Sequence, residues 1–364
     1  MHDNACCDHE HTHAGHRDCC GGHAHAETGQ HDCCGSHSHA ASEGCGCGHE
    51  HSHSQVEHDA NAELLAGGWQ MPRKAVAQEA PQPAREFDFP WQGQSLHVRQ
   101  WGEQGAVPVV ALHGFMQTGA SWAAVAGALS ADHCVYALDF IGHGQSSKPT
   151  APEAYSYDAA IGSVQSFLRE VACANGQRRA HLLGYSMGGR VAAGVAAKER
   201  DCLYSLVLES CNLGPASEED RVAAEQRNSE WAARLRTDGI EPFVDYWEQL
   251  PLFTTQRELG FDEVQRPERL ANDAEAMALC LEGMGKHAMP LEDDAFAQLS
   301  ATWVPIKYLW GYEDAKSQPI AHRFEHDGFD VSSFGTGHNV HLEAPALYTK
   351  AVKEFLSGIE PKAL

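Results

Sequence analysis

The chain has 364 residues, of which 50 are acidic and 26 are basic, so its formal net charge at pH 7 is −24. A charge of this sign argues against nucleic acid or an anionic membrane surface as the main partner. No apolar run reaches the roughly 20 residues that cross a bilayer. The first residues also lack the basic and apolar regions of a secretory signal, so we expect a cytoplasmic location.

Residues 1–59 form a loose repeat in which cysteine pairs precede alternating histidines: CCDHEHTH, CCGGHAH, CCGSHSH and CGCGHEHSH. The segment has too few large aliphatic residues to fold alone, so we expect a disordered tail. Thiolates and imidazoles are the ligands that zinc, copper(I) and nickel favour. The repeat therefore predicts metal binding, the alternative being a low-complexity extension that binds metal only incidentally. The candidate ligands are His9, His11, His13, Cys19, Cys20, His23, His25, Cys33, Cys34, His37, His39, Cys45, Cys47, His49, His51 and His53.

After a predicted linker over residues 60–85, the pattern is that of an α/β protein. FDFPWQGQSLHVRQWG predicts a hairpin around Gln92-Gly93. Continuous apolar runs then predict strands at VPVVALHGF, CVYALDF, AHLLGYS, LYSLVLES, VPIKYLWGYED and DVSSF. Helices are predicted at SWAAVAGALS, 157–174, MGGRVAAGVAAKER and 345–356. Strands of this kind, alternating with helices, imply a mostly parallel sheet with helices on both faces.

Residues 214–300 separate two of the predicted strands and are too numerous for a simple loop. Their charged, helical character predicts a cap over the carboxyl edge of the sheet, where ligands bind in open α/β sheets. The core would then consist of residues 86–213 and 301–364.

GYSMG at residues 184–188 lies between an apolar strand and an alanine-rich helix, as a nucleophile elbow does. Ser186 is its candidate nucleophile or base. Asp314 and His338 follow later, each just past a predicted strand, in the order acid then histidine. The acid would hold the histidine tautomer and stabilise the imidazolium. In the alternative interpretation, Ser186 is an ordinary turn residue and Asp314 is a helix cap.

Other residues could fill the same roles. Glu209 ends the strand after the elbow helix and is a second candidate acid, while His341 and His143 are candidate bases. An oxyanion hole would use the backbone N–H groups of Met187 and Phe115.

Arg190 lies one turn after Ser186, where the helix dipole disfavours a cation. It is either a clamp for a substrate carboxylate or part of an ordinary salt bridge. Lys316 follows the candidate acid by two residues and points to the same region. The cap adds four arginines, each of which is by itself more often solvated than bound to a ligand: Arg221, Arg227, Arg234 and Arg269. Together these residues predict a small polycarboxylate substrate.

Several motifs together resemble the MenH family: LHGFMQTGASW, LDFIGHGQSS, LGYSMGGR, WEQLPLF, LWGYEDAK and GTGHNVHLEAP. The resemblance covers residues 87–358. Members of this family are 2-succinyl-6-hydroxy-2,4-cyclohexadiene-1-carboxylate synthases of menaquinone biosynthesis. The resemblance implies an α/β-hydrolase fold used as a lyase, which eliminates pyruvate from 2-succinyl-5-enolpyruvyl-6-hydroxy-3-cyclohexene-1-carboxylate. It implies no cofactor for catalysis.

By this resemblance Ser186, activated by His338 and Asp314, acts as a general base and forms no acyl-enzyme. Further matches are Arg190, Arg269 and Lys316 at positions that hold carboxylates, and Trp247 in the pocket wall. Two features depart from the pattern. The basic residue early in the cap has no clear match, and Glu248 stands where relatives often have tyrosine. A carboxylate there would be unfavourable beside an anionic substrate unless it points away.

Two other functions remain open at this point. The first is a serine carboxylesterase or carbon–carbon bond hydrolase that acts through an acyl-enzyme. The second is a binding or metal-handling protein whose α/β part is catalytically idle.

Overall fold

The structure is a computed structural model that describes residues 81–359, so the tail with its candidate metal ligands lies outside the described residues. An eight-stranded sheet has the order β1-β2-β4-β3-β5-β6-β7-β8. Strand β2 pairs with β1 and β4 antiparallel, and all later neighbours are parallel. The strands are β1 (Arg85–Trp91), β2 (Gln94–Trp101), β3 (Val107–Leu112), β4 (His133–Leu138), β5 (Ala180–Tyr185), β6 (Leu203–Glu209), β7 (Ile306–Gly311) and β8 (Asp330–Phe334).

Local sequence explains the shape of the sheet. Gln92 and Gly93 both have positive φ, of 47° and 77°, as a tight hairpin turn between β1 and β2 requires. Every residue of β4, β5 and β7 is buried. These strands are mostly apolar because helices cover both of their faces, and their few polar residues are His133, His181 and Lys307.

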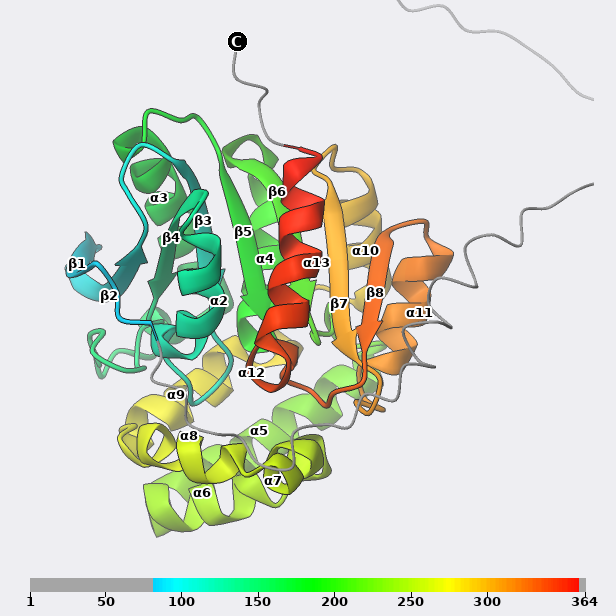
Figure 1. Ribbon diagram of the computed structural model, residues 1–364. Helices are drawn as coiled ribbons and strands as arrows, with labels where there is room; N and C mark the ends of the chain where they lie inside the picture. The colour runs from blue at the N-terminus through cyan, green and yellow to red at the C-terminus, as the bar shows by residue number, and fades with distance from the viewer. Residues whose placement is uncertain (1–80, 360–364) are drawn as a thin grey trace, which may run out of the picture. The chain divides into compact units, whose positions relative to one another are not determined.

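Helices lie on both sides of the sheet (Figure 1). One face packs against α3 (Tyr157–Ala174), α4 (Met187–Lys198), α10 (Glu292–Ser300) and α11 (Gln318–His326). The other face packs against α2 (Ala123–Leu129) and α13 (Pro345–Ser357). A short helix, α12 (Val340–Glu343), precedes α13. The 3₁₀ turns are η1 (Gly119–Trp122), η2 (Pro152–Tyr155), η3 (Arg200–Cys202), η4 (Pro251–Phe253) and η5 (Lys286–Ala288).

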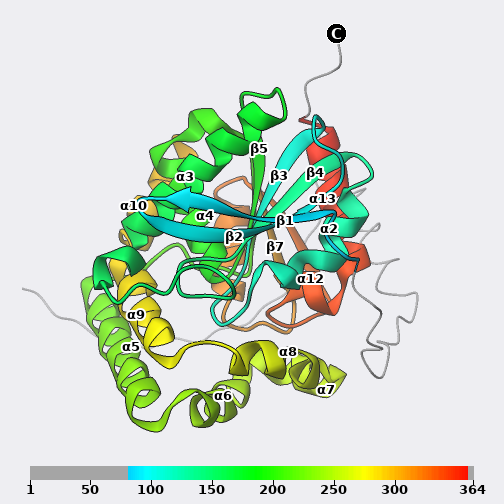
Figure 2. The ribbon, with the colours of Figure 1, turned by 90° about the vertical axis from the view of Figure 1, so that its left-hand side faces the viewer.

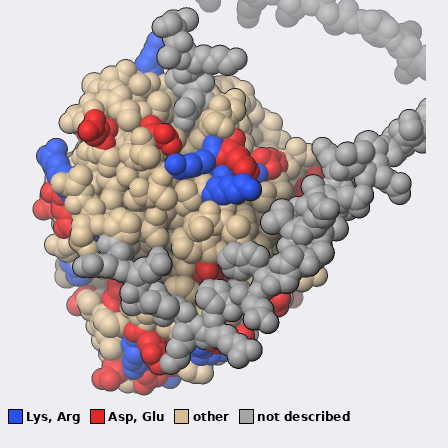
Figure 3. Space-filling view, in the orientation of Figure 1, with Lys and Arg blue, Asp and Glu red and all other residues tan. Residues whose placement is uncertain are grey.

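Five further helices gather at the carboxyl ends of the parallel strands, as the two perpendicular views show (Figures 1 and 2). They are α5 (Glu218–Asp238), α6 (Ile240–Glu248), α7 (Thr254–Leu259), α8 (Phe261–Leu270) and α9 (Ala274–Met284). On the face in Figure 3, acidic and basic side chains lie next to each other over this layer. The layer occupies the place that was predicted for a cap.

The structure agrees closely with the predicted elements but differs in two places. The hairpin, the six later strands and the helix over 157–174 are all present. Helix α10 falls inside the range predicted for the cap, yet it packs against α4 of the core. Helix α11 was not predicted, because QPIAHRFEH is short and follows a polar loop. Within residues 81–359, no helix combines the length and apolarity needed to cross a membrane.

Candidate active site

Ser186 lies at the sharp turn between β5 and α4, with φ at +50°. This backbone region is uncommon for a residue with a side chain. The turn depends on small neighbours, since a Cβ atom on Gly184 would lie 2.6 Å from the carbonyl oxygen of Gly188. Ser186 therefore reaches the carboxyl edge of the sheet beside the N-terminus of α4, where the helix dipole favours negative charge.

Ser186, His338 and Asp314 form a hydrogen-bonded chain. The Ser186 Oγ lies 3.0 Å from His338 Nε2, and His338 Nδ1 lies 2.6 Å from Asp314 Oδ2. Burial alone would raise the pKa of the Asp314 carboxyl. Its interactions with His338, Ser317 and Lys316 outweigh burial and lower the pKa below the ordinary value. Asp314 is thus a carboxylate that fixes the histidine ring with Nε2 toward the serine.

Glu209 and His341, the alternative candidates for acid and base, form a hydrogen bond with each other. Glu209 Oε2 lies 2.8 Å from His341 Nδ1, and both side chains are fully buried. The His341 ring stacks on Trp122 with ring centroids 4.0 Å apart. His143 packs edge-on against Phe115, with centroids 5.9 Å apart. These residues support the loops around the site and are not in the Ser186–His338–Asp314 chain.

Residues 113–118 form a loop after β3 that carries Phe115, and the first turn of α4 holds this loop in place. The Gly188 N–H donates to the His113 carbonyl oxygen at 3.1 Å. Phe115 and Met187, whose N–H groups were predicted to form an oxyanion hole, both line the cavity above Ser186. The two backbone segments that would provide the hole are therefore joined directly.

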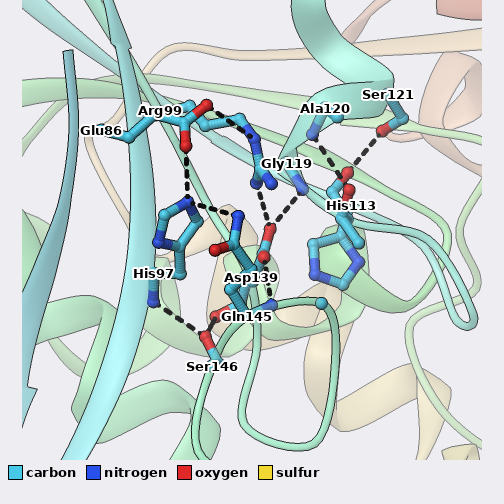
Figure 4. A network of polar contacts seen from close by, with 12 residues as sticks. Glu86, His97, Arg99, His113, Gly119, Ala120, Ser121, Asp139, Gln145 and Ser146 are labelled. Atoms are coloured by element: carbon cyan, nitrogen blue, oxygen red, sulfur yellow. Dashed lines mark hydrogen bonds and ion pairs between the residues drawn. The ribbon is translucent and has the colours of Figure 1, made fainter. Parts of the chain in front are cut away.

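A polar network holds the far end of this loop (Figure 4). Asp139, fully buried just after β4, accepts hydrogen bonds from Gly119 N and from Arg99 Nη1, both at 2.7 Å. His113 Nε2 accepts from Phe140 N at 3.0 Å. Burial lowers the pKa of His113 to about 3, so its ring is neutral and can accept this bond.

The cap holds the same loop from the opposite side. Thr118 Oγ1 donates a short hydrogen bond to the carboxyl of Glu268 on α8. Asn272 Nδ2 donates to the Met116 carbonyl oxygen at 3.2 Å. Sequence reasoning missed Asp139, Glu268 and Asn272, although the position of Asp139 directly after a buried strand was a usable signal.

A cavity of about 720 Å³ lies between the sheet edge and the cap. Arg190 and Lys316 line it, and neither has an ion-pair partner within the described part of the chain. Burial lowers the pKa of the Arg190 guanidinium. Burial, followed by the charge of Arg190, lowers the pKa of Lys316 to about 8. Lys316 is nonetheless open to water through the cavity, so an anion can reach it.

The groups around Arg190 that could carry a negative charge are thiols and a phenol. Burial raises the pKa of Cys211 to about 12 and also raises the pKa of Cys280 and Tyr157. All three are therefore neutral at ordinary pH and cannot serve as counterions. The Arg190 Nε is buried and has no hydrogen-bond acceptor within residues 81–359.

Comparison with known proteins places the chain in a family. The alpha/beta hydrolase fold model matches residues 107–345. A putative 2-succinyl-6-hydroxy-2,4-cyclohexadiene-1-carboxylate synthase of Bacillus subtilis is 30% identical over 268 residues, covering 72% of this chain and 94% of the relative. The chain belongs to the MenH family. Its fold is the α/β-hydrolase fold, and it is a lyase-type enzyme of that superfamily.

Solved structures agree with this assignment. MenH from S. aureus is 26% identical with a TM-score of 0.66, covering 72% of this chain and 99% of its own. An enol-lactonase from Burkholderia xenovorans LB400 is 25% identical with a TM-score of 0.61, covering 74% and 99%. Residues 1–59 lie outside the range that the alpha/beta hydrolase fold model matches.

Two further residues predicted to bind substrate, Trp247 and Arg269, also line the cavity of this MenH-family chain, but their contacts differ from each other. Trp247 lines it and packs against Phe115, with ring centroids 5.3 Å apart. Arg269 also lines it, but its Nη1 forms an ion pair with Glu248 Oε1 at 3.1 Å. Glu248 therefore does point away from the open space, toward a cation of the protein itself.

The other cap arginines divide between surface and cavity. Arg221 pairs with Glu218, and Arg234 pairs with Asp238. Arg227 lines the cavity and lies over the ring of Trp231, 5.5 Å from its centroid.

Proposed function

We propose that the chain is a 2-succinyl-6-hydroxy-2,4-cyclohexadiene-1-carboxylate synthase that eliminates pyruvate from 2-succinyl-5-enolpyruvyl-6-hydroxy-3-cyclohexene-1-carboxylate. The observation that carries the proposal is the half-buried Arg190, which has a buried Nε and no counterion among residues 81–359 and lies one helical turn from Ser186. A guanidinium in this state binds a carboxylate strongly, because the cost of its desolvation is already met in the fold. Lys316 adds a second cation for the same polycarboxylate.

In the proposed reaction Ser186 is a general base. His338 takes the serine proton, and the serine oxygen removes the ring proton next to the succinyl ketone. The N–H groups of Phe115 and Met187 stabilise the enolate that forms on the ketone oxygen. When this enolate returns to the ketone, a double bond forms between C2 and C3 of the ring and the existing double bond moves from C3–C4 to C4–C5. The bond between C5 and the enolpyruvyl oxygen breaks, and the departing pyruvate enolate takes up a proton to become pyruvate.

Local charge explains how an acidic chain can bind such a substrate. The overall charge of −24 is spread over the whole molecule, and at physiological ionic strength it is screened within about 8 Å. Arg190, Lys316 and Arg227 line the cavity without ion-pair partners among residues 81–359 and therefore dominate the potential where the carboxylates bind.

A pyruvate-release assay tests the proposal. Purified protein is mixed with the enolpyruvyl precursor, and pyruvate is followed with a coupled dehydrogenase. We expect release well above the spontaneous rate, and a Ser186→Ala chain that stays near that rate. Release equal to the protein-free control would refute the proposal.

An acyl-enzyme hydrolase is the alternative that the same Ser186–His338–Asp314 geometry supports. That function predicts a burst of product from a chromogenic ester and a covalent adduct on Ser186, seen by mass spectrometry. The proposed lyase predicts turnover of the precursor with no adduct.

For the tail we propose binding of zinc, nickel or copper(I), supported by the four Cys/His units of residues 1–59. The test compares the full chain with a full-length variant in which the eight cysteines of the tail are serines. We expect the variant to bind less of each metal in equilibrium dialysis and to release pyruvate at an unchanged rate. Equal metal binding by both chains would contradict this proposal.

A further inference from the structure

Four charged side chains of the cap form a row from the surface to the cavity. Arg266 Nη2 lies 2.6 Å from Asp245 Oδ1, and Arg266 Nη1 lies 2.7 Å from Glu248 Oε2. Arg269 Nη1 completes the row at 3.1 Å from Glu248 Oε1. Side-chain exposure falls along the row, from 61% at Asp245 through 33% and 7% to 3% at Arg269. Two acids and two arginines give the row no net charge.

Arg269 has protein partners on both terminal nitrogens. Its Nη2 donates to Gln265 Oε1 at 2.6 Å and to Gln256 Oε1 at 3.2 Å. The guanidinium also lies over the ring of Phe253, 5.1 Å from the centroid. A carboxylate that binds an arginine in the two-pronged mode needs two free N–H groups. Arg190, in contrast, has a buried Nε without an acceptor in the described chain.

We propose that Glu248 is a specificity-determining residue that neutralises Arg269 inside the cavity. The carboxylates of the ligand are then attracted by the lining cations that have no ion-pair partner among residues 81–359, namely Arg190, Lys316 and Arg227. The inference rests on the proposed function, because it takes the ligand to be a polycarboxylate. A ligand carboxylate at Arg269 would have to displace Glu248, whose side chain is 7% exposed. The displaced carboxylate would lose a buried ion pair and would repel the ligand. Glu248 thus limits the number of carboxylates that the cap side of the cavity accepts.

Equilibrium binding of two stable probes tests this inference. The first is 2-succinylbenzoate, an aromatic dicarboxylate shaped like the product named for the relatives. The second is 4-oxo-4-phenylbutanoate, which lacks the ring carboxylate. Glu248→Gln keeps the size and hydrogen-bonding capacity of the side chain but removes its charge. We expect this variant to bind 2-succinylbenzoate about tenfold more tightly by calorimetry, with a smaller gain for the monocarboxylate.

Asp245→Asn is the matched control. It removes an equal charge from the same row, but at a side chain that is 61% exposed and contacts Arg266. Solvent screens a charge in that place, so we expect binding within about twofold of the unmodified chain. An unchanged or weaker affinity of Glu248→Gln for the dicarboxylate would overturn the inference.

A double variant keeps the inference testable if Glu248→Gln does not fold. Glu248→Gln/Arg269→Met removes both charges and leaves no unpaired arginine at this position. If Glu248 and Arg269 together exert no net attraction on the ligand, the double variant binds 2-succinylbenzoate within about threefold of the unmodified chain. A loss of tenfold or more would show that Arg269 holds a ligand carboxylate in the natural chain and would refute the inference.

The binding readout separates this inference from the proposed function. If the unmodified chain releases no pyruvate but Glu248→Gln binds 2-succinylbenzoate more tightly, the proposed reaction is refuted and the role of Glu248 is supported. If the unmodified chain releases pyruvate but Glu248→Gln gains no affinity, the reaction is supported and the role of Glu248 is refuted.

Discussion

The cavity has two walls, one on the core and one on the cap, and their basic residues differ in whether they form ion pairs within the protein. The core wall, formed by Ser186, His338, Arg190 and Lys316, has two cations without ion-pair partners among residues 81–359. On the cap wall, Arg269 is paired within the protein before any ligand binds. Arg227, also on the cap wall, lines the cavity and has no ion-pair partner among residues 81–359. Counting arginines in the sequence would not distinguish these states. The difference indicates that pairing decides where this cavity attracts an anion.

The largest expected effect concerns the reacting group of the core wall. Ser186→Ala removes the proposed base while leaving the cavity charges in place. We expect pyruvate release to fall by about 10³-fold, in the range of general base catalysis, with 2-succinylbenzoate binding nearly unchanged. Ser357→Ala, at an exposed serine of the last helix, is the control and should keep full activity. If Ser186→Ala released pyruvate as fast as the unmodified chain, Ser186 could not be the catalytic base.

Arg190→Met tests the unpaired cation. We expect kcat/KM to fall about 100-fold, which corresponds to roughly 3 kcal/mol for a lost charge-assisted interaction. The stability of the variant should be maintained or increased, because a half-buried charge without a counterion opposes folding. Thermal unfolding and steady-state kinetics on the same sample measure both quantities.

Arg269→Met provides the opposite case on the cap wall. It leaves Glu248 buried and paired with Arg266 alone, so we expect a loss of roughly 3 kcal/mol in stability, typical of a broken buried ion pair. If Arg190→Met proved the less stable variant of the two, the contrast between the walls would be wrong.

Lys316 gives the core wall a pH dependence. Its pKa is lowered to about 8, so the free protein loses this charge as the pH rises through 8. A bound carboxylate favours the protonated form, and affinity for 2-succinylbenzoate should therefore be highest below pH 8 and fall by about tenfold above it. Lys316→Met should lack this step, whereas Lys350→Met, at an exposed lysine, should retain it. If Lys316→Met lost as much affinity for 2-succinylbenzoate above pH 8 as the unmodified chain, the pH dependence would come from another group.

The smallest expected effect concerns the contact through which the cap holds the loop of Phe115. Thr118→Val keeps the shape of the side chain but removes the hydroxyl that donates to Glu268 and accepts from Ala120 N at 3.2 Å. We expect kcat to fall about fivefold with little change in KM, the size of one or two lost hydrogen bonds. Thr237→Val, at an exposed threonine of the cap, is the control. A change confined to KM would mean that this contact shapes binding and not the reacting geometry.

Much of the fold and the centre of the site could be predicted from short segments. The helix over 157–174 and the hairpin at Gln92-Gly93 follow from local periodicity and turn chemistry. Helix α10 was assigned to the cap because charge and helical character do not reveal which neighbour a helix packs on. Glu268 and Asn272 were missed for a similar reason, since their partners in the 113–118 loop lie some 150 residues earlier in the chain.

The sequence by itself determined the elbow and the order of Ser186, Asp314 and His338. The elbow needs small residues within one tight turn, and parallel strands bring the ends that bear the other two to the same edge. Only the tertiary structure decided which cations are free. Whether Arg269 meets Glu248 depends on how α6 and α8 pack on each other. Whether Arg190 meets only neutral thiols and a phenol depends on how α3, α9 and the segment after β6 surround it. That packing is set by contacts between distant segments, which no local pattern encodes.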